Sequence, residues 1–296
     1  MEIKEVRLDD SDYPRLLKEI KDPPNPLYYA GDLKLASERC AAVVGSRTAT
    51  EYGCWAARRL GARLAESGVV VVSGMAKGID ACAHEGALES GRSEEVSHSE
   101  VGSGRTIAVL GCGIDVCYPA SNRRLWKEIA RKGLLLSEYP EGTEPARYRF
   151  PRRNRIISGL AEAVVVVQAK ERSGALITAE LAADQGRNVY AIPGNINSAY
   201  NLGSNKLLRD GAMPLVVMED ILDDMGLASS HLQKIRKDLG KDEMTLISLL
   251  EKNGEMTADQ LCAATGQPPF QISGIVTILE MKGVIYTSLG KIFIAK

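Results

Sequence analysis

The chain has 296 residues, of which 45% are hydrophobic and 25% are charged. These values are typical of globular proteins and exclude a disordered or fibrous chain, and the length predicts one large domain with a smaller one. The formal net charge is -1. A nucleic-acid site would therefore need a local concentration of Arg and Lys, because the surface as a whole is not basic.

The cysteines and the N-terminus narrow the chemistry further. The six cysteines form no CxxC pair and none lies near a His at metal-ligand spacing, so we predict reduced core residues, no metal site and no cofactor. The first residues lack the apolar segment of a signal peptide, and no stretch reaches the roughly 18 apolar residues of a membrane span. We expect a cytoplasmic protein that does not contact a membrane.

The first 39 residues contain four prolines, which disfavour long helices. We predict that residues 1–39 form an N-terminal arm that packs on the main domain. This arm is assigned no function of its own.

Residues 40–228 alternate short apolar runs with helical stretches, which is the pattern of βαβ units in a parallel sheet. Continuously apolar runs such as residues 69–72 indicate strands with both faces covered. The fold class predicted is therefore α/β, with a Rossmann-like, mostly parallel sheet and helices on both faces. The predicted strands are Ala41–Val44, Val69–Ser73, Thr106–Leu110, Leu134–Ser137, Ala163–Val167, Asn188–Ile192 and Leu215–Met218.

Two polar segments interrupt or end this pattern. Residues 93–102 are rich in Ser, Glu and Gly and predict a solvated loop insertion, and residues 229–241 predict a linker. Residues 242–296 then show three helical segments and two short strands, which predict a small C-terminal winged-helix domain. Its third helix, Phe270–Lys282, offers only Lys282 as a cation, so we expect protein interaction or dimer support and no reading of duplex DNA.

Ligands of an open parallel sheet bind beyond the carboxyl ends of its strands. Four turns at this edge are rich in glycine, and two of them precede helices whose free N–H groups favour an anion. None matches a dinucleotide or ATPase fingerprint. The polar and cationic residues of these turns are Gly45, Ser46, Arg47, Lys77, Lys170 and Arg172.

The segment from Arg147 to Arg155 places five arginines within nine residues, without an acid and with Tyr148 and Phe150 among them. Cations that contact phosphates, next to aromatic faces on which unpaired bases stack, are the two components of single-strand binding. The alternative is a solvated helix whose arginines pair with Glu141 or Glu144.

These motifs together resemble those of the DNA-processing protein A family, DprA or Smf, over nearly the whole chain from Tyr13 onwards. The matching segments are Gly45–Arg47, Ser73–Asp80, Phe150–Leu160, Ser173–Leu176, Gly194–Asn195 and Asn201–Gly203. The chain departs from the family in its insertion at 93–102, and it begins almost directly at the arm, where many members have an extra helical module.

The resemblance implies a protein that receives incoming single-stranded DNA during natural transformation, protects it and helps to load the RecA recombinase. It implies a dimerising Rossmann-like domain, hence a homodimer, and no catalysed reaction. Motif matches assign DNA contact to Arg47 and to the group Arg152, Arg153, Asn154 and Arg155. Strand-end geometry and the arginine cluster add the remaining predicted DNA-binding residues, Gly45, Ser46, Lys77, Arg123, Arg124, Arg149, Lys170 and Arg172.

Two other functions remain open from the sequence. Residues 174–180 resemble the Gly/Thr/Glu signature of nucleotide phosphoribohydrolases, which would make Glu180 catalytic, although the double-glycine phosphate turn of those enzymes is missing. A module that binds a small nucleotide would explain the glycine turns but not the clustered arginines.

Overall fold

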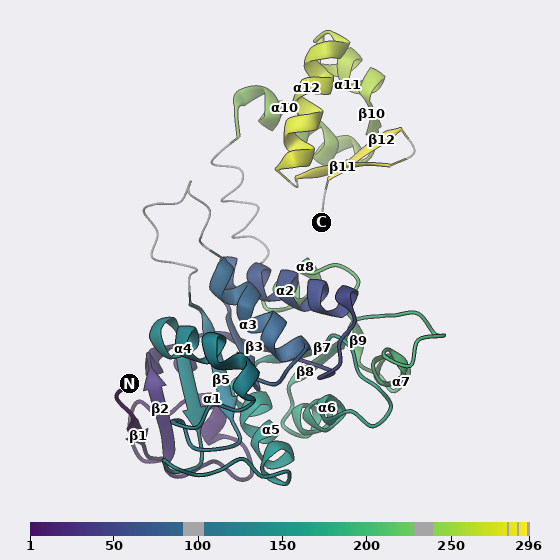
Figure 1. Ribbon diagram of the computed structural model, residues 1–296. Helices are drawn as coiled ribbons and strands as arrows, with labels where there is room; N and C mark the ends of the chain where they lie inside the picture. Colours follow the sequence, from purple (N-terminus) through teal and green to yellow (C-terminus); the bar gives the residue numbers. More distant parts are fainter. Residues whose placement is uncertain (91–103, 228–238, 283, 289, 295–296) are drawn as a thin grey trace. The chain divides into compact units, whose positions relative to one another are not determined.

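The computed structural model describes residues 1–90, 104–227, 239–282, 284–288 and 290–294 (Figure 1). The chain divides into two compact units, Met1–Met225 and Gly226–Lys296, which are described separately. The predicted insertion at 93–102 and most of the predicted linker at 229–241 lie outside the described residues.

The larger unit is built on a nine-stranded sheet with the order β1-β2-β6-β5-β4-β3-β7-β8-β9. The strands from β6 to β9 along this order pair in parallel. Strand β2 pairs antiparallel with both of its neighbours, β6 and β1. This confirms the predicted α/β class with a mostly parallel sheet. The strands are β1 (Lys4–Val6), β2 (Leu27–Gly31), β3 (Cys40–Val44), β4 (Val70–Ser73), β5 (Thr106–Leu110), β6 (Leu134–Ser137), β7 (Ala163–Val166), β8 (Asn188–Ala191) and β9 (Met213–Pro214).

The first 39 residues are part of this sheet. Strand β2 pairs with β6, so that Ala30 lies opposite Leu135, and β1 pairs with the outer side of β2. The short helix α1 (Arg15–Lys18) buries Leu17 completely, and a 3-10 helix follows at Leu33–Ser37. The N-terminal segment therefore adds the last two strands at one edge of the sheet.

Helices cover both faces of the sheet, as predicted (Figure 1). The first face carries α2 (Glu51–Glu66), α3 (Ile79–Glu89) and α4 (Arg123–Lys132), preceded by a 3-10 helix at Ala120–Asn122. The second carries α1, α5 (Arg149–Leu160), α6 (Gly174–Asp184) and α7 (Leu202–Arg209). Because side chains alternate along a strand, Val70 and Val72 pack with α5 while their neighbour Val71 is buried on the other side.

The predicted strand Leu215–Met218 is wrong. Strand β9 comes earlier, and Met213 pairs with Tyr190 of β8. The backbone N–H groups of Val216 and Val217 instead donate to the carboxylate of Asp220, at 3.3 and 3.1 Å. These donors form a turn that leads into helix α8 (Glu219–Asp224), so they are unavailable to a strand ladder.

The described residues of the smaller unit form three helices and a three-stranded antiparallel sheet of order β10-β12-β11. Thr257 caps α11 through a hydrogen bond from the Gln260 N–H at 3.2 Å, as its side-chain chemistry predicts. Strand β10 is an addition to the two predicted strands. The elements are α10 (Lys241–Asn253), β10 (Met256–Thr257), α11 (Ala258–Thr265), α12 (Pro269–Met281), β11 (Ile285–Ser288) and β12 (Lys291–Ile294).

Candidate nucleic-acid interface

A cleft of about 650 Å³ lies where the strand order reverses. Chain connections run outward from β3 in one direction to β4 and later in the other to β7, which makes the β3/β7 border the switch point of the sheet. The turn after β3, the loop after β7 and the start of α5 form the walls. The cleft is therefore at the carboxyl ends of the strands, the position at which open α/β sheets bind ligands.

Four exposed cations line this cleft and make no ion pair with any described residue. They are Arg47, Arg147, Lys170 and Arg172. The acid between the last two, Glu171, pairs with Lys206 instead. The cleft therefore presents uncompensated positive charge although the chain as a whole is nearly neutral.

Aromatic rings lie among these cations. The guanidinium carbon of Arg47 is 5.3 Å from the centroid of the Phe150 ring, and Tyr118 stacks on the same ring at 5.3 Å with an interplanar angle of 28°. The Lys170 ammonium lies 4.5 Å from the Tyr200 ring centroid. Cation–π contacts of this kind hold the charged groups in place without neutralising them.

Arg153 lies beneath the cleft with only 4% of its surface exposed. Its guanidinium donates to the carbonyl oxygens of Gly74, at 2.7 Å, and Val109. Burial lowers the pKa of Arg153 to about 10, and the charge of Asp80 opposes this shift, so the group stays protonated near neutral pH. A Cβ atom at Gly74 would lie 2.6 Å from this guanidinium, which explains why glycine follows β4.

Asp80 is the one carboxylate among the residues that line the cleft. It is buried at the start of α3, and its carboxylate accepts from the Ala76 N–H at 3.4 Å. Burial raises its pKa, and the charge of Arg153 lowers it. Arg153 therefore balances the one acid of the cleft, while the four exposed cations remain free to attract a polyanion.

Gly45 and Ser46 line the cleft and have structural roles in its wall. A Cβ atom at Gly45 would lie 2.6 Å from Ile79, and the Ser46 N–H donates to the Gln168 carbonyl at 2.7 Å. The helix that follows, α2, is capped by Thr50, whose hydroxyl accepts from the Gly53 N–H, and begins with Glu51, so part of its N-terminal charge is already complemented within the chain. Asn154 also lines the cleft, and its amide donates to the Gly174 carbonyl at 3.3 Å, which ties α5 to α6.

Arg155, which the sequence predicts to contact DNA, is held by acidic partners within the protein. Its guanidinium pairs with Glu138 at 2.8 Å and with Asp22 at 3.2 Å, and the Arg155 and Glu138 side chains are 10% and 7% exposed. This pair is internal and does not line the cleft. The partners of the arginine cluster therefore include Glu138, and not the side chains of Glu141 or Glu144 that the alternative interpretation named.

Arg152 and Arg149 also lie outside the cleft lining. Arg152 pairs with Glu138 at 3.4 Å although 57% of its side chain is exposed. The guanidinium of Arg149 lies over the rings of Tyr139 and Tyr148, at 4.9 and 5.5 Å, and donates to the Glu144 carbonyl. Their charges are thus held by internal partners that sequence spacing could not reveal.

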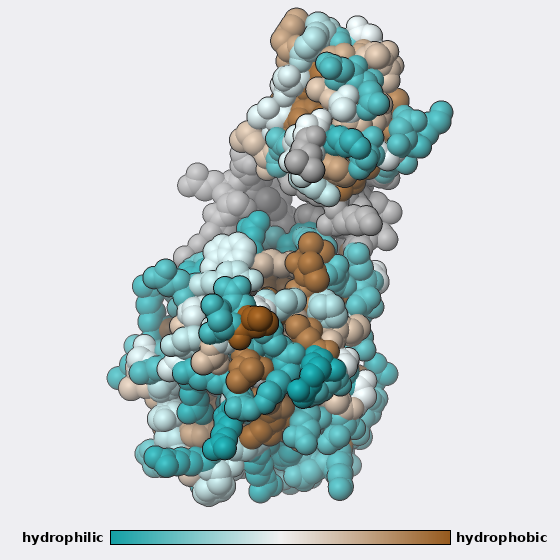
Figure 2. All heavy atoms as spheres, turned by 90° about the vertical axis from the view of Figure 1, so that its right-hand side faces the viewer, coloured by the Kyte–Doolittle hydropathy of each residue, from teal (hydrophilic) through white to brown (hydrophobic). Residues whose placement is uncertain are grey.

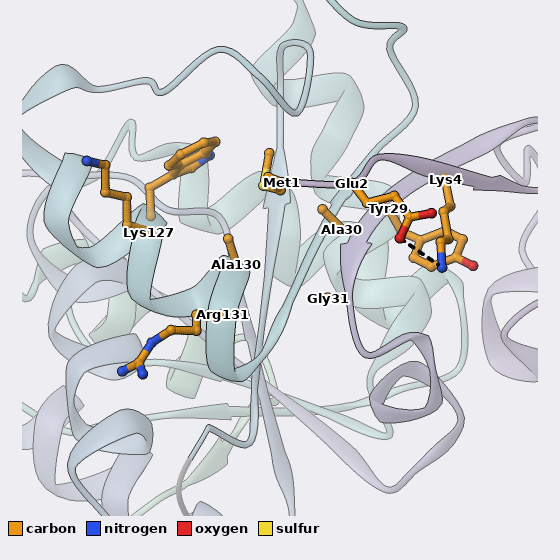
Figure 3. A pocket seen from close by; sticks show the side chains of 10 residues that line it. Met1, Glu2, Lys4, Tyr29, Ala30, Gly31, Lys127, Ala130 and Arg131 are labelled. Atoms are coloured by element: carbon orange, nitrogen blue, oxygen red, sulfur yellow. Dashed lines mark ion pairs between the residues drawn. The ribbon is translucent and has the colours of Figure 1, made fainter.

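Lys77, Arg123 and Arg124 are exposed but do not line the cleft either. Arg124 lies 3.9 Å from Glu128 and lines a different depression, beside Glu85 and Glu89. A third pocket, of about 480 Å³, lies between α4 and β2 (Figure 3). Of its three cations, Lys127 and Arg131 point away from each other and Lys4 pairs with Glu2 at 3.3 Å, so it forms no concentrated anion site.

Sequence reasoning left out three lining residues of note. Arg147 and Phe150 belong to the segment from Arg147 to Arg155. The sequence around them does not show that they, and not Arg149 or Arg152, line the cleft. Tyr118 lies eight residues after the end of β5, at the end of the loop that follows the turn Gly111–Gly113. The one feature of the sequence that could have pointed to Tyr118 is that its loop begins at the end of a predicted strand.

The structure gives no support to Glu180 as a catalytic acid. This side chain is exposed on α6 and lines a separate groove with Leu176 and Met213, away from the cleft. Over the described ranges, no group of His, Cys, Asp or Glu could hold a metal ion, and all six cysteines are free. No helix within these ranges is long and apolar enough to cross a membrane.

Comparison with known proteins assigns the family. Residues 4–226 match the model of the family described as DNA recombination-mediator protein A. The chain is 42% identical to Protein Smf of Synechocystis over 92% of its own length and 72% of the relative's. It is 44% identical to the DNA processing protein DprA of Streptococcus pneumoniae, over 73% of this chain and 71% of that one.

Two solved structures share the fold. DNA processing protein A of Streptococcus pneumoniae superposes with a TM-score of 0.69 at 42% identity, covering 75% of this chain and 74% of that one. DNA processing protein A of Helicobacter pylori, whose structure is described as showing a unique single-stranded DNA binding mode, gives 0.66 at 30% identity over 76% and 96%. The chain belongs to the DNA recombination-mediator protein A family, which includes the DprA and Smf proteins.

Proposed function

We propose that this protein binds single-stranded DNA along the cleft at the switch point of its sheet. The observation that carries the proposal is the set of four exposed cations that line the cleft without an acid partner among the described residues, one of which, Arg47, lies over the Phe150 ring. Unpaired cations contact successive phosphates, and an aromatic face accepts an unpaired base. A merely solvated surface would mix acidic and basic side chains, whereas the exposed charged residues of this cleft are all basic.

We place this activity in DNA uptake and recombination. The relatives named as DNA processing proteins and the Helicobacter structure support a role in which the protein receives and protects incoming single strands in the cytoplasm. Delivery of the strand to RecA recombinase and the absence of a catalysed reaction are parts of the same proposal.

A homodimer is also part of the proposal. Figure 2 shows hydrophobic side chains exposed on the side of the larger unit that carries α7 and β9. Ile196, Leu202 and Val216 are 94%, 39% and 75% exposed in this part of the chain. An apolar surface of this kind is typical of a protein–protein contact.

The test is a titration of fluorescent oligonucleotides of increasing length, with duplex and mononucleotide controls, at several salt concentrations. Affinity for single strands should rise with length and fall with salt. Arg47→Ala should weaken binding across all sequences and reduce the slope of log K against log salt by about 0.7, the contribution of one phosphate contact in a single strand.

Arg131→Ala is the matched control, because it removes an exposed cation that lies in the pocket of Figure 3 and not in the cleft. It should leave both affinity and salt slope unchanged. Equal effects of the two substitutions would remove the cleft as the binding site. A mononucleotide that binds as tightly as a long strand would replace the proposal with a nucleotide-binding module, which the cleft volume also permits.

A further inference from the structure

Two large aromatic side chains, Tyr52 and Trp55, lie exposed near the start of α2. Tyr52 is 51% exposed and Trp55 is 59% exposed, and their ring centroids are 6.0 Å apart with an interplanar angle of 29°. Neither residue lines the cleft, and the cleft function leaves both unexplained. A stacked aromatic pair that keeps half of its surface in water offers a flat apolar face to a further planar group.

The pair is held close to the cleft by a rigid connection. Thr48 lines the cleft and Tyr52 follows four residues later, so their Cα atoms are at most about 14 Å apart. Between them, the Thr50 N–H and hydroxyl both donate to the side-chain oxygen of Gln168, each at 3.1 Å. The Gln168 amide in turn donates to Asn201 at 3.0 Å, which anchors the start of α2 to the carboxyl edge of the sheet.

The charge beside the pair fits a polyanion. Tyr52, Trp55 and Arg59 follow the spacing i, i+3, i+7, which places them on one face of α2. Arg59 is exposed and makes no ion pair with a described residue, whereas its neighbour Arg58 pairs with Glu85 and Glu89. Glu51 is the one acid in the first turn of this helix, where it complements the helix dipole.

We infer that the Tyr52–Trp55 pair is a stacking platform for bases of a DNA strand that leaves the cleft past Arg47. The inference rests on the proposed function and extends the binding site from the cleft onto α2. An unpaired strand is the occupant that fits, because Tyr52 follows the cleft residue Thr48 by four positions and the pair combines aromatic faces with the exposed Arg59. A duplex would keep its bases stacked on each other and could not use the rings.

Tryptophan fluorescence tests the platform directly, since the chain has two tryptophans. Trp126→Phe leaves Trp55 as the single reporter, and Trp126 itself lines the pocket between α4 and β2, apart from the cleft. In this variant, oligothymidylates that are just long enough to bind, as judged by anisotropy, should leave the emission unchanged. Longer ones should quench it, whereas the reverse variant, Trp55→Phe, should show no length-dependent quenching of Trp126.

Affinity gives a second readout. Trp55→Ala should weaken binding of long strands roughly 10-fold to 100-fold, the range expected for one lost base stack, and leave short strands unaffected. The salt slope should not change, because stacking releases no counterions. Trp55→Phe should retain most of the affinity, and the thermal midpoint of each variant should match the parent because the side chain is exposed.

The outcomes separate the platform from the cleft. If the unaltered protein binds no single strand at low salt, the proposed function itself fails. If it binds with the expected length and salt dependence while Trp55 emission and the Trp55→Ala affinity stay the same, only the platform fails. A Trp55 signal that depends on protein concentration without DNA would show that a second copy covers the pair, and would also overturn the inference.

Discussion

At the scale of single residues, the arginines of one nine-residue segment divide into different tasks. Arg147 lies exposed in the cleft, Arg153 is buried beneath it, and Arg155 is paired internally with Glu138. Arg147 precedes α5. On the helix, successive positions face in different directions, so Arg152, Arg153 and Arg155 meet water, the sheet edge and the N-terminal segment in turn. The same residue type therefore lines the cleft at one position and pairs within the protein at another.

Arg155 provides the test of this division. Arg155→Met should lower the free energy of unfolding by about 3 kcal/mol, because it leaves the buried Glu138 carboxylate with only the more distant Arg152. Urea denaturation measures this loss. The double variant Arg155→Met with Glu138→Leu should recover most of it, and the salt slope of oligonucleotide binding should remain that of the parent. A weaker slope without a loss of stability would return Arg155 to the DNA-contact set.

His84 gives the protein a defined response to acid. The Thr106 hydroxyl donates to the Val71 carbonyl at 2.8 Å, so at 2.7 Å it must accept from the His84 Nδ1–H. The other ring nitrogen, Nε2, is buried without a partner among the described residues. Burial therefore lowers the pKa of His84 to about 3, and the charge of Arg153 acts in the same direction.

The sign of the effect follows from proton uptake. Below pH 6.5 the unfolded chain binds a proton at this residue and the native protein does not, so stability is full above this pH and falls as the pH drops toward 3. The slope from this one group is at most about 1.4 kcal/mol per pH unit. His84→Gln should flatten the dependence of the unfolding free energy between pH 6.5 and 5. An unchanged slope would mean that another group titrates in this range.

At the scale of elements, the sequence predicted most of the parallel strands well because each is a short, mostly apolar run. Strands β5 and β6 have the predicted bounds, and β3, β4, β7 and β8 differ by one residue at an end. The pattern failed at residues 215–218, where an apolar run ends in a turn held by Asp220. Hydrophobicity shows that a segment can be buried, but not which partner takes its backbone donors.

The candidate site was predictable only in part for a related reason. Strand-end geometry placed Arg47, Lys170 and Arg172 at one edge, and the cleft brings them together. The order of the strands decides which turns become neighbours. Local periodicity predicts the single strands but not their order in the sheet. Lys77 and Arg123 follow β4 and β5 and do not line the cleft, although Asp80 and Tyr118 from the same two connections do, so the strand end alone does not decide which side chains reach it.

At the scale of the whole molecule, the two units differ in where exposed cations gather: the larger unit has the cleft, and the third helix of the smaller unit has none. Helix α12 contains no Lys or Arg, and Lys282 just beyond it pairs with Glu243 at 2.7 Å. A helix that reads the major groove needs donors aimed at base edges and phosphates. The smaller unit therefore lacks the chemistry for duplex recognition on this helix, and we assign the proposed single-strand binding to the larger unit.

A shortened protein tests this assignment. Residues 1–225 form a complete compact unit with its own core, so the fragment should bind single strands with the affinity and salt slope of the full chain within about threefold. Anisotropy titrations of both proteins with the same oligonucleotides provide the measurement. A loss of more than tenfold with an intact fold would place part of the binding site in residues 226–296.

The strand order that creates the cleft also governs how the chain can be assembled during synthesis. Strand β3 ends at Val44, but its neighbour β7 begins only at Ala163, about 120 residues later. At a translation rate of roughly 5 to 20 residues per second, β7 is synthesised about 6 to 24 seconds after β3, and until then this edge of β3 has no partner strand. Throughout this interval a nascent half-sheet exposes an unpaired strand, which is a template for aggregation. The strand order that forms the cleft thus leaves one edge of β3 without its partner until more than half of the chain has been made.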